Sequence, residues 1–469
     1  MMELKNIQAV YFIGIGGIGM SAIARYFNEV GVRVAGYDKT PSVLTRQLEE
    51  EGMHIHYTDD VELIPKDVQL VVYTPAIPKV HAAYQFYLKN NYPVVKRSDV
   101  LQIITGHSFN ICVAGTHGKT TISTITGHLL RHSGFGCNAF LGGISVNYNR
   151  NFWAQTDTAA KQVCVVEADE YDRSFLQLSP DIAVITAMDA DHLDIYGTAE
   201  AMEDAFIEFT HRIKPGGWLI SKYGLKRGKE LVAANSITYH LNNNQAAIHA
   251  QNLKVKQGGY QFDVVFNTEA DFWVLQNVHL TIGGLHNVEN TLAAVAIAHI
   301  LGIADEKIKE AVAAFKGVKR RFEYVIEPGE GKVVFIDDFA HHPEELRALI
   351  EGARSLFDKS KIVLVFQPHL YSRTRDLAGA FAESLALADE VVLLPVYPAR
   401  ELPIEGVTSG LIADQMEEGK VAVLEKEEVT AWAAGLNTSA QPLVFITAGA
   451  GDIDLLLPQL KNELTHASG

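Results

Sequence analysis

A glycine-rich segment between a predicted strand and a predicted helix constrains the fold of this chain most strongly. The segment Gly115-Thr116-His117-Gly118-Lys119-Thr120-Thr121 follows the apolar run 111–114 and precedes the helical pattern 122–130. A strand, a glycine turn and a helix in this order present unpaired backbone N–H groups to a phosphate. The alternative is a glycine-containing turn with a surface lysine. The strand and helix on either side favour the phosphate loop, and hence an α/β domain.

The residue types within this loop predict its chemistry. Lys119 supplies a mobile cation for phosphate oxygens, and the Thr120 hydroxyl can coordinate Mg²⁺. The usual pattern has a further glycine where this chain has Val113, so the loop is a shortened variant. We therefore take Lys119 as a catalytic candidate, and the candidate ATP-binding residues are Gly115, Thr116, His117, Gly118, Lys119, Thr120 and Thr121.

Short apolar runs alternate with helical patterns along most of the chain, which is typical of parallel sheets covered by helices. The alternation starts three times, which predicts domains at 1–107, 108–322 and 323–469. Between about 237 and 282 the pattern changes to longer strands separated by Gly and Asn turns. The expected fold class is α/β with three domains. The first and third are Rossmann-like, and the central one is a phosphate-loop ATPase domain with a mostly parallel sheet and a small antiparallel part.

Composition narrows the partners and the compartment. The 469 residues carry a formal net charge of −16, which argues against nucleic acid or an anionic membrane surface as a partner. No apolar stretch is long enough to span a bilayer, and residues 1–6 lack the layout of a signal peptide. Cys112, Cys137 and Cys164 are scattered, so we expect free thiols and a cytoplasmic protein.

A second glycine motif lies near the N-terminus. Gly14-Ile15-Gly16-Gly17-Ile18-Gly19 fits G-x-G-x-x-G between a predicted strand and a predicted helix, and Asp38 ends the next strand. Alone, this motif suggests NAD or a purely structural turn. Because the chain has a separate ATP-type loop, we interpret the motif as the site of a diphosphate-bearing substrate. Its candidate binding residues are Gly16, Gly17, Ile18, Gly19 and Asp38.

A carboxylate and a histidine, each following a predicted strand, indicate the metal site. Glu167 ends the apolar run 163–166, which is expected beside the phosphate loop, and His192 follows the buried run 182–187. Thr120, Glu167 and His192 are the candidate metal ligands, although Mg²⁺ prefers oxygen and His192 can equally be a histidine at a helix start. Asp169, Glu170 and Asp172 are interpreted as solvated or structural.

The third block carries polar residues at its strand ends, where parallel sheets bind ligands. Asp337-Asp338-Phe339-Ala340-His341-His342-Pro343 follows one strand, and His341 is a catalytic candidate there. Gln367-Pro368-His369-Leu370-Tyr371-Ser372-Arg373-Thr374-Arg375 follows the next, where arginine can clamp a carboxylate through two hydrogen bonds. Surface salt bridges are the alternative for each arginine.

Together, these segments resemble the motifs of the Mur ligase family over nearly the whole chain. The further segments that carry the resemblance are Met20-Ser21 after the first glycine motif, Glu167-Ala168-Asp169-Glu170, Asp172-Arg173-Ser174-Phe175, Asp191-His192-Leu193-Asp194, His286-Asn287-Val288-Glu289-Asn290, Arg320-Arg321-Phe322 and Gln367-Pro368-His369.

The resemblance implies an ATP-dependent ligase of bacterial peptidoglycan synthesis. The motifs favour the branch that joins L-alanine to the lactyl carboxylate of UDP-N-acetylmuramate through an acyl phosphate, with Mg²⁺. By matching motifs, Lys119 would hold the γ-phosphate, Thr120 and Glu167 one Mg²⁺, and His192 with Glu167 a second metal; Asn290, Arg321 and Asp338 would hold ATP; and His369 and the catalytic candidate Arg373 would face the amino acid. The first domain would bind the UDP moiety.

Two positions differ from the family pattern, and other functions stay open. Phe339 stands where the family commonly has tyrosine, and Leu370 where it often has arginine, so the amino-acid contacts are less defined. The first alternative is a ligase that joins murein tripeptide to the same sugar nucleotide; segments 172–175 and 191–197 favour the alanine-adding branch. An NAD-dependent oxidoreductase leaves the phosphate loop unexplained, and Lys119 and Glu167 argue against a non-catalytic ATP-gated protein. The sequence indicates no oligomeric state.

Overall fold

The computed structural model describes residues 6–157, 161–190, 193–268, 271–329, 331–399, 401–436 and 441–466. The chain forms two compact units. The first contains Met1–Ala250, Val264–Leu275 and Glu289–Ala311, and the second contains Gln251–Asp263, Gln276–Val288 and Val312–Gly469. The two glycine loops therefore lie in one unit, and the predicted third domain lies in the other.

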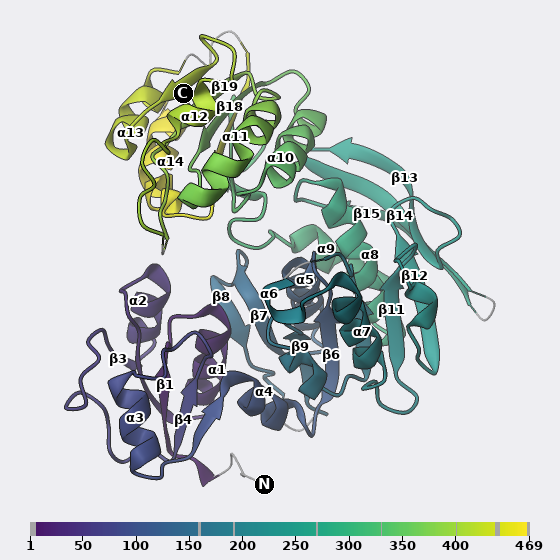
Figure 1. Cartoon of the computed structure of the whole chain (residues 1–469). Helices are drawn as coiled ribbons and strands as arrows, with labels where there is room; N and C mark the ends of the chain where they lie inside the picture. Colours follow the sequence, from purple (N-terminus) through teal and green to yellow (C-terminus); the bar gives the residue numbers. More distant parts are fainter. Residues whose placement is uncertain are drawn as a thin grey trace. The chain divides into compact units, whose positions relative to one another are not determined.

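The N-terminal sheet has five strands in the order β3-β2-β1-β4-β5, all parallel. Figure 1 labels β3, β1 and β4 in its purple part. Its strands are β1 (Ala9–Ile13), β2 (Arg33–Tyr37), β3 (His54–His56), β4 (Leu70–Tyr73) and β5 (Val94–Lys96), and its helices are α1 (Ile18–Glu29), α2 (Val43–Glu50), α3 (Ala82–Lys89) and α4 (Arg97–Thr105). This order is that of a dinucleotide-binding fold. The strand order reverses beside β1, so ligands are expected at the carboxyl ends of β1 and β4.

The central sheet has ten strands in the order β15-β14-β13-β12-β11-β10-β6-β9-β7-β8. Its strands are β6 (Phe109–Ala114), β7 (Asn138–Ser145), β8 (Arg150–Trp153), β9 (Val163–Glu167), β10 (Ile182–Ile185), β11 (Trp218–Lys222), β12 (Asn235–His240), β13 (Ile248–Lys256), β14 (Gly259–Asn267) and β15 (Phe272–Leu280). Its helices are α5 (Lys119–His132), α6 (Leu193–Tyr196), α7 (Ala199–Thr210), α8 (Leu285–Ile300) and α9 (Asp305–Ala314). Strand β6 lies between β10 and β9 and is parallel to both, so the phosphate loop emerges from the buried middle of the sheet.

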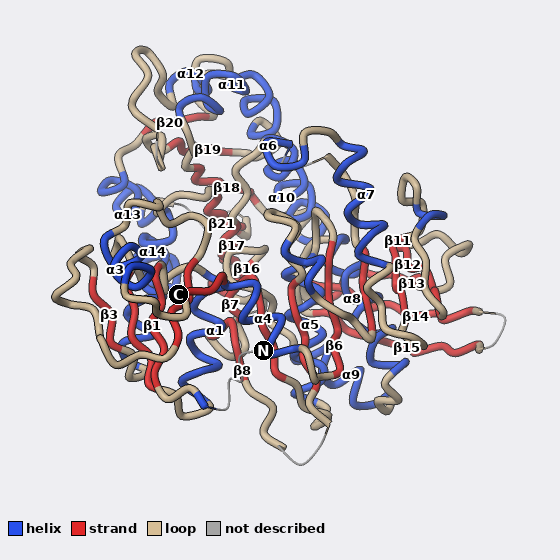
Figure 2. The backbone as a smooth tube through the Cα atoms, turned by 60° about the horizontal axis from the view of Figure 1, so that its bottom comes forward, coloured by secondary structure: helices blue, strands red, loops and turns tan. Residues whose placement is uncertain are grey.

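The antiparallel part predicted for the central sheet begins at a tight turn. Gln257 and Gly258, which join β13 to β14, both have positive φ (49° and 74°). Two such residues form the turn whose twist matches a β-hairpin. Figure 2 shows β11 to β15 following one another along one side of this sheet.

The C-terminal sheet has six strands in the order β16-β17-β21-β18-β19-β20. Its strands are β16 (Glu323–Ile326), β17 (Val333–Asp338), β18 (Lys361–Phe366), β19 (Glu390–Leu393), β20 (Val421–Val423) and β21 (Leu443–Ala448), and its helices are α10 (Pro343–Leu356), α11 (Tyr371–Leu385), α12 (Gly410–Ala413), α13 (Lys426–Ala434) and α14 (Leu457–His466). Only β16 runs antiparallel to its neighbour. The middle strands are almost wholly buried, as expected for a sheet covered on both faces.

The predicted fold class is confirmed, because the sheets are mostly parallel and alternate with helices. The boundaries after 107 and 322 stay predictions. No predicted apolar run covers β3, β7, β8, β16 or β20, most of which are short or carry exposed polar positions, and β12 and β13 were predicted only as part of the strand-rich segment that begins near 237. Within the described ranges, the structure has no helix that is long and apolar enough to cross a membrane.

Candidate active site

The phosphate loop has the backbone geometry that its two glycines predict. Gly115 has a φ of 128°, and a Cβ there would lie 2.1 Å from Thr186 Oγ1. Gly118 has a φ of 79° and directly precedes α5, so the loop ends at the helix N-terminus. Asn290 of α8 reaches this point, because a Cβ on Gly118 would lie 2.8 Å from Asn290 Oδ1. The structure thus brings one predicted ATP residue, Asn290, to the loop.

Lys119 is held by an acidic partner that the sequence analysis left outside the site. Its Nζ donates to Gly115 O and to Glu170 Oε1, both at 2.7 Å. The Glu170 side chain is 1% exposed, and its Oε2 has no hydrogen-bond partner among the described residues. Burial raises the pKa of Glu170, and Lys119 opposes that rise. The interpretation of Glu170 as solvated or structural therefore missed its place beside Lys119.

Two of the three predicted metal ligands lie together. Thr120 Oγ1 donates to Glu167 Oε1 at 3.0 Å, and Glu167 Oε2 accepts from Gly142 N at 3.0 Å. The third, His192, lies outside the described residues. Among the described residues, no three His, Cys, Asp or Glu side chains are grouped to hold a metal ion. Mg²⁺ is commonly held by one or two carboxylates, substrate phosphates and water. The oxygen pair of Thr120 and Glu167 fits that requirement.

The first glycine loop is closed over its own acidic residue. Asp38 Oδ2 accepts from Gly16 N at 2.7 Å, which ties the end of β2 to the loop. A Cβ on Gly16 would lie 2.8 Å from this carboxylate oxygen. Gly17 precedes α1, and no side chain caps the start of that helix. The start of α1 is therefore open to an anion.

The first glycine loop and Lys119 of the phosphate loop border one cavity of about 450 Å³. From the N-terminal sheet and its helices, the lining residues include Gly17, Ile18, Gly19, Thr74 and Arg97, and from the central sheet they include Lys119, Gly142, Glu167, Asp169 and Glu170. The motif of the N-terminal sheet and the lysine of the phosphate loop thus border the same space. This proximity is what a reaction between two phosphate-bearing ligands requires.

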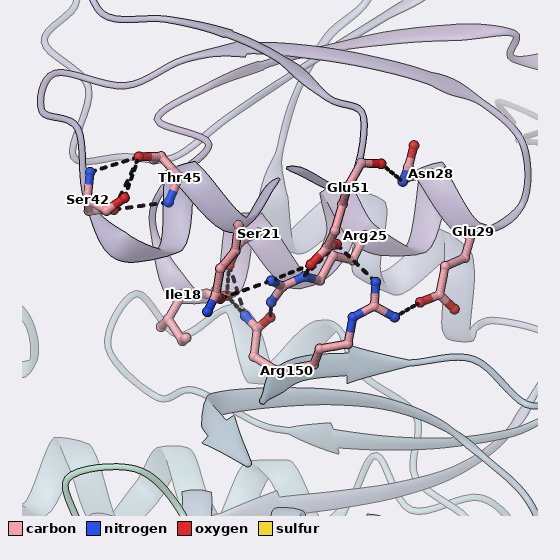
Figure 3. A network of polar contacts seen from close by, with 11 residues as sticks. Ile18, Ser21, Arg25, Asn28, Glu29, Ser42, Thr45, Glu51 and Arg150 are labelled. Carbon is pink, nitrogen blue, oxygen red and sulfur yellow. Dashed lines mark hydrogen bonds and ion pairs between the residues drawn. The ribbon is translucent and has the colours of Figure 1, made fainter. Parts of the chain in front are cut away.

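A buried polar network fixes the glycine-loop helix to the central sheet (Figure 3). Arg25 of α1, whose side chain is fully buried, donates to both carboxylate oxygens of Glu51 and to Asn151 Oδ1 of β8. Asn151 Nδ2 donates to Ile18 O at 2.6 Å and to Ser21 Oγ at 2.9 Å. Arg150 adds contacts to Glu29 and Glu51 at 2.7 and 3.1 Å. This network holds the first turn of α1 at the cavity.

The predicted ATP residues of the second unit have different environments. Asp338 accepts from Phe322 N and Ala340 N at 2.7 and 2.8 Å, and burial raises its pKa to about 6. The Arg321 side chain is exposed. Its neighbour Arg320 instead donates to Gly449 O and Gly451 O, and its Nε lies 3.5 Å from Asp337. Arg320 therefore serves the structure of the unit, and Arg321 is the arginine left accessible to a ligand.

The candidate amino-acid residues lie close together in the second unit. His341 and His369 have ring centroids 5.9 Å apart, and burial lowers the pKa of His369. Buried polar atoms without a hydrogen-bond partner among the described residues include His369 Nδ1 and Arg373 Nη1. Leu370 between them has a φ of 72°, a strained conformation for a branched side chain. The cluster combines unpaired polar groups with strain, which often accompany ligand sites.

Sequence reasoning missed Arg97, Gly142 and Glu170. Arg97 begins α4, and its Nη2 lies 3.4 Å from Asp169 Oδ2. No motif contains Arg97 or Gly142, and only the fold brings them to the loops. A signal existed for Glu170, because it follows the predicted metal ligand Glu167 by three residues, but its burial depends on the tertiary structure.

The fold and the loops define an α/β nucleotide-binding protein with a phosphate loop. Three models of one family match the chain in succession: "Mur ligase family, catalytic domain" over residues 9–108, "Mur ligase middle domain" over 113–298 and "Mur ligase, glutamate ligase domain" over 320–451. The chain belongs to the Mur ligase family.

Similar proteins match over nearly their whole length. The UDP-N-acetylmuramate–L-alanine ligases of Flavobacterium johnsoniae and Cytophaga hutchinsonii are each 46% identical, over 99% and 98% of this chain and 100% and 97% of theirs. A crystal structure of the UDP-N-acetylmuramate-alanine ligase of Thermotoga maritima matches with a TM-score of 0.82 and 27% identity, over 98% of this chain and 100% of that one. A murein peptide ligase of Psychrobacter arcticus shares the fold, with a TM-score of 0.65 and 22% identity over 97% and 99% of the two chains.

Proposed function

We propose that this protein joins L-alanine to the lactyl carboxylate of UDP-N-acetylmuramate while converting ATP to ADP and phosphate, in peptidoglycan synthesis. Its relatives of 46% identity carry that activity in their names and match end to end. The observation that carries the proposal is the cavity of about 450 Å³ that the first glycine loop and Lys119 both border. A sugar nucleotide at the first loop can place its carboxylate near the phosphate held by Lys119.

The chemistry proceeds in two steps. A carboxylate oxygen attacks the γ-phosphorus of ATP, which forms an acyl phosphate and releases ADP. The alanine amine then attacks the acyl carbon, loses a proton, and the bond to the phosphate oxygen breaks. No covalent bond to the protein is needed, so the protein acts by positioning and by stabilising charge. Lys119 is the preorganised cation for the transferred phosphoryl group.

We propose that Thr120 and Glu167 hold one Mg²⁺, with His192 and Glu167 at a second metal position. Bound Mg²⁺ neutralises charge on the phosphate oxygens. The Thr120–Glu167 hydrogen bond and the carboxylate's second bond, from Gly142 N, support this assignment, because they fix two oxygen ligands beside the loop. Thr116, His117 and Thr121 complete the proposed ATP loop, with Asn290, Arg321 and Asp338 contributing from other elements.

We assign the amino acid to His369 and Arg373, with His341 as a catalytic candidate beside them. The Arg373 guanidinium offers two parallel donors that match a carboxylate. Its buried Nη1 has no partner in the described chain, so an arriving carboxylate satisfies it. Phe339, which is 42% exposed, lacks the hydroxyl that a tyrosine would bring to this region.

ADP release measured across substrates tests the proposal. We expect ADP only when UDP-N-acetylmuramate and L-alanine are both present, and little ADP when murein tripeptide replaces L-alanine. Efficient use of the tripeptide would assign the chain to the tripeptide-joining ligases. NADH formation from NAD⁺ without ADP release would favour an oxidoreductase.

We also propose the cytoplasm as the site of action. All three cysteines are buried free thiols, which suits a reducing compartment. ATP, the proposed phosphoryl donor, is made available there. Fractionation of cells with an antibody to the chain tests this location.

A further inference from the structure

The Arg97 guanidinium lies against Gly19, so that a side chain at Gly19 would require Arg97 to move. A Cβ on Gly19 would lie 2.5 Å from Arg97 Nη1 and 3.1 Å from Arg97 Cζ. The third glycine of the motif therefore admits a guanidinium to the start of α1. In a dinucleotide-binding fold the third glycine usually allows close packing of helix against strand. The contact of Gly19 with the Arg97 guanidinium is a different role.

This placement is electrostatically unfavourable without an anion. The N-terminus of α1 carries a partial positive charge, and a cation beside it is repelled. The Arg97 side chain is 22% exposed, and its acidic partner is Asp169, at 3.4 Å and itself 44% exposed. An exposed contact of that length offsets little of the cost. An anion between the helix start and the guanidinium would be bound by both.

The cavity that Arg97 lines has a further mark of a polar ligand site. Glu170 also lines it, is almost completely buried, and leaves Oε2 without a hydrogen-bond partner in the described part of the chain. Lys119 lies at the same cavity. The ligand must therefore carry both anionic groups and hydrogen-bond donors, as a nucleoside diphosphate sugar does.

We propose that Arg97 binds the diphosphate of the sugar nucleotide, and that Asp169 holds Arg97 in place until the diphosphate displaces it. This inference rests on the proposed function, which assigns the sugar nucleotide to the first glycine loop. Arg97 comes from α4, after the last strand of the N-terminal sheet, and Asp169 follows β9 of the central sheet. Binding of the diphosphate thus exchanges a contact between the two sheets for a contact with substrate.

Calorimetric titration of the full chain with UDP and with UDP-N-acetylmuramate tests the inference. Arg97→Gln should weaken binding of both by about 10- to 100-fold, the usual value of a hydrogen bond to a charged group. Arg97→Lys should recover only part of the affinity, because lysine lacks the planar fork. Asp169→Asn should tighten binding, since it frees Arg97 while keeping an oxygen for its bond from Tyr171 N.

The two variants should change the affinity for UDP in opposite directions, and this separates a ligand contact of Arg97 from a structural one. Thermal unfolding checks that each variant folds, and an ATP analogue should bind wild type and Arg97→Gln equally. If Arg97→Gln does not fold, tighter binding by Asp169→Asn still supports the inference, and weaker or unchanged binding overturns it. Equal UDP affinity in wild type and a folded Arg97→Gln also overturns it. If wild type binds neither UDP nor the sugar nucleotide, the proposed function itself fails at this loop.

Discussion

Lys119 and Glu170 form an ion pair of 2.7 Å in which the lysine side chain is 14% exposed and the glutamate 1%. The lysine of a phosphate loop is thus held in place by a buried carboxylate before any nucleotide arrives. Because Glu170 and Lys119 both line the cavity, a phosphate there can compete with the Glu170 carboxylate for the Lys119 ammonium group. The two residues therefore define both the position of the cation and its availability.

Lys119→Ala should lower the turnover number by about 10²–10³, the usual effect of removing one preorganised contact to the transition state. The fold should survive, because Lys119 is only the first residue of α5 and alanine is a good helix former. Steady-state ADP release measures the effect, and circular dichroism checks the fold. Lys226→Ala is the matched control, since Lys226 is 70% exposed and pairs with Glu203 away from the cavity. Near-normal turnover in the Lys119 variant would remove this loop from the ATP site.

The first glycine loop should bind UDP-N-acetylmuramate and not NAD⁺. We propose the phosphate loop as the ATP site, and Asp38, whose Oδ2 accepts from Gly16 N, can still contact the ribose of either ligand through its remaining acceptor sites. Calorimetric titration of the full chain with UDP-N-acetylmuramate and with NAD⁺ measures the two dissociation constants. Tighter binding of NAD⁺ contradicts the assignment of this loop to a sugar nucleotide.

Asn151→Ala should lower the free energy of unfolding of the first unit by about 1–3 kcal/mol, because it leaves the buried Nη1 of Arg25 without its bond to Asn151 Oδ1. Arg150→Ala removes partly exposed ion pairs of the same network and should cost less than about 1 kcal/mol. Urea unfolding followed by tryptophan fluorescence compares them. Equal costs for the two variants would show that the buried amide does not hold α1.

Arg373→Lys should raise the Michaelis constant for L-alanine much more than those for ATP and UDP-N-acetylmuramate. The charge is kept, so the effect reports the lost fork geometry. Arg375→Lys is the control: Arg375 is exposed and pairs with its neighbour Asp376. If all three constants rise together, Arg373 stabilises the fold and the alanine site lies elsewhere.

The pH dependence of stability should carry a contribution from Asp337. Burial raises the pKa of this carboxyl to about 7, against about 3.9 in the unfolded chain. The folded state therefore holds the proton more tightly, and the contribution is complete below about pH 4 and is lost as the pH rises through 7. The difference in unfolding free energy between wild type and Asp337→Asn should fall by about 2 kcal/mol from pH 5 to pH 8. A difference that stays constant contradicts this.

The sequence predicted the features that are local in the chain. The long apolar runs became β1, β6, β9, β17, β18 and β21, and both glycine motifs became strand-to-helix turns. Strand β7 was missed because its glycines at 142 and 143 weaken the pattern, although Gly142 supplies a bond to Glu167. Arg97 and Asn151 could not be found from spacing, since their roles arise from contacts between distant segments. Two neighbouring arginines also look alike in sequence, and only the fold separates the partly buried, paired Arg320 from the exposed Arg321.

The most direct measurement of the central claim follows an oxygen atom. UDP-N-acetylmuramate labelled with ¹⁸O in its lactyl carboxylate is incubated with the protein, ATP, Mg²⁺ and L-alanine, and the released phosphate is analysed by mass spectrometry. Activation through an acyl phosphate requires that each phosphate leaves with one carboxylate oxygen. The account predicts labelled phosphate in proportion to the amide formed, and unlabelled phosphate released alongside amide would contradict it.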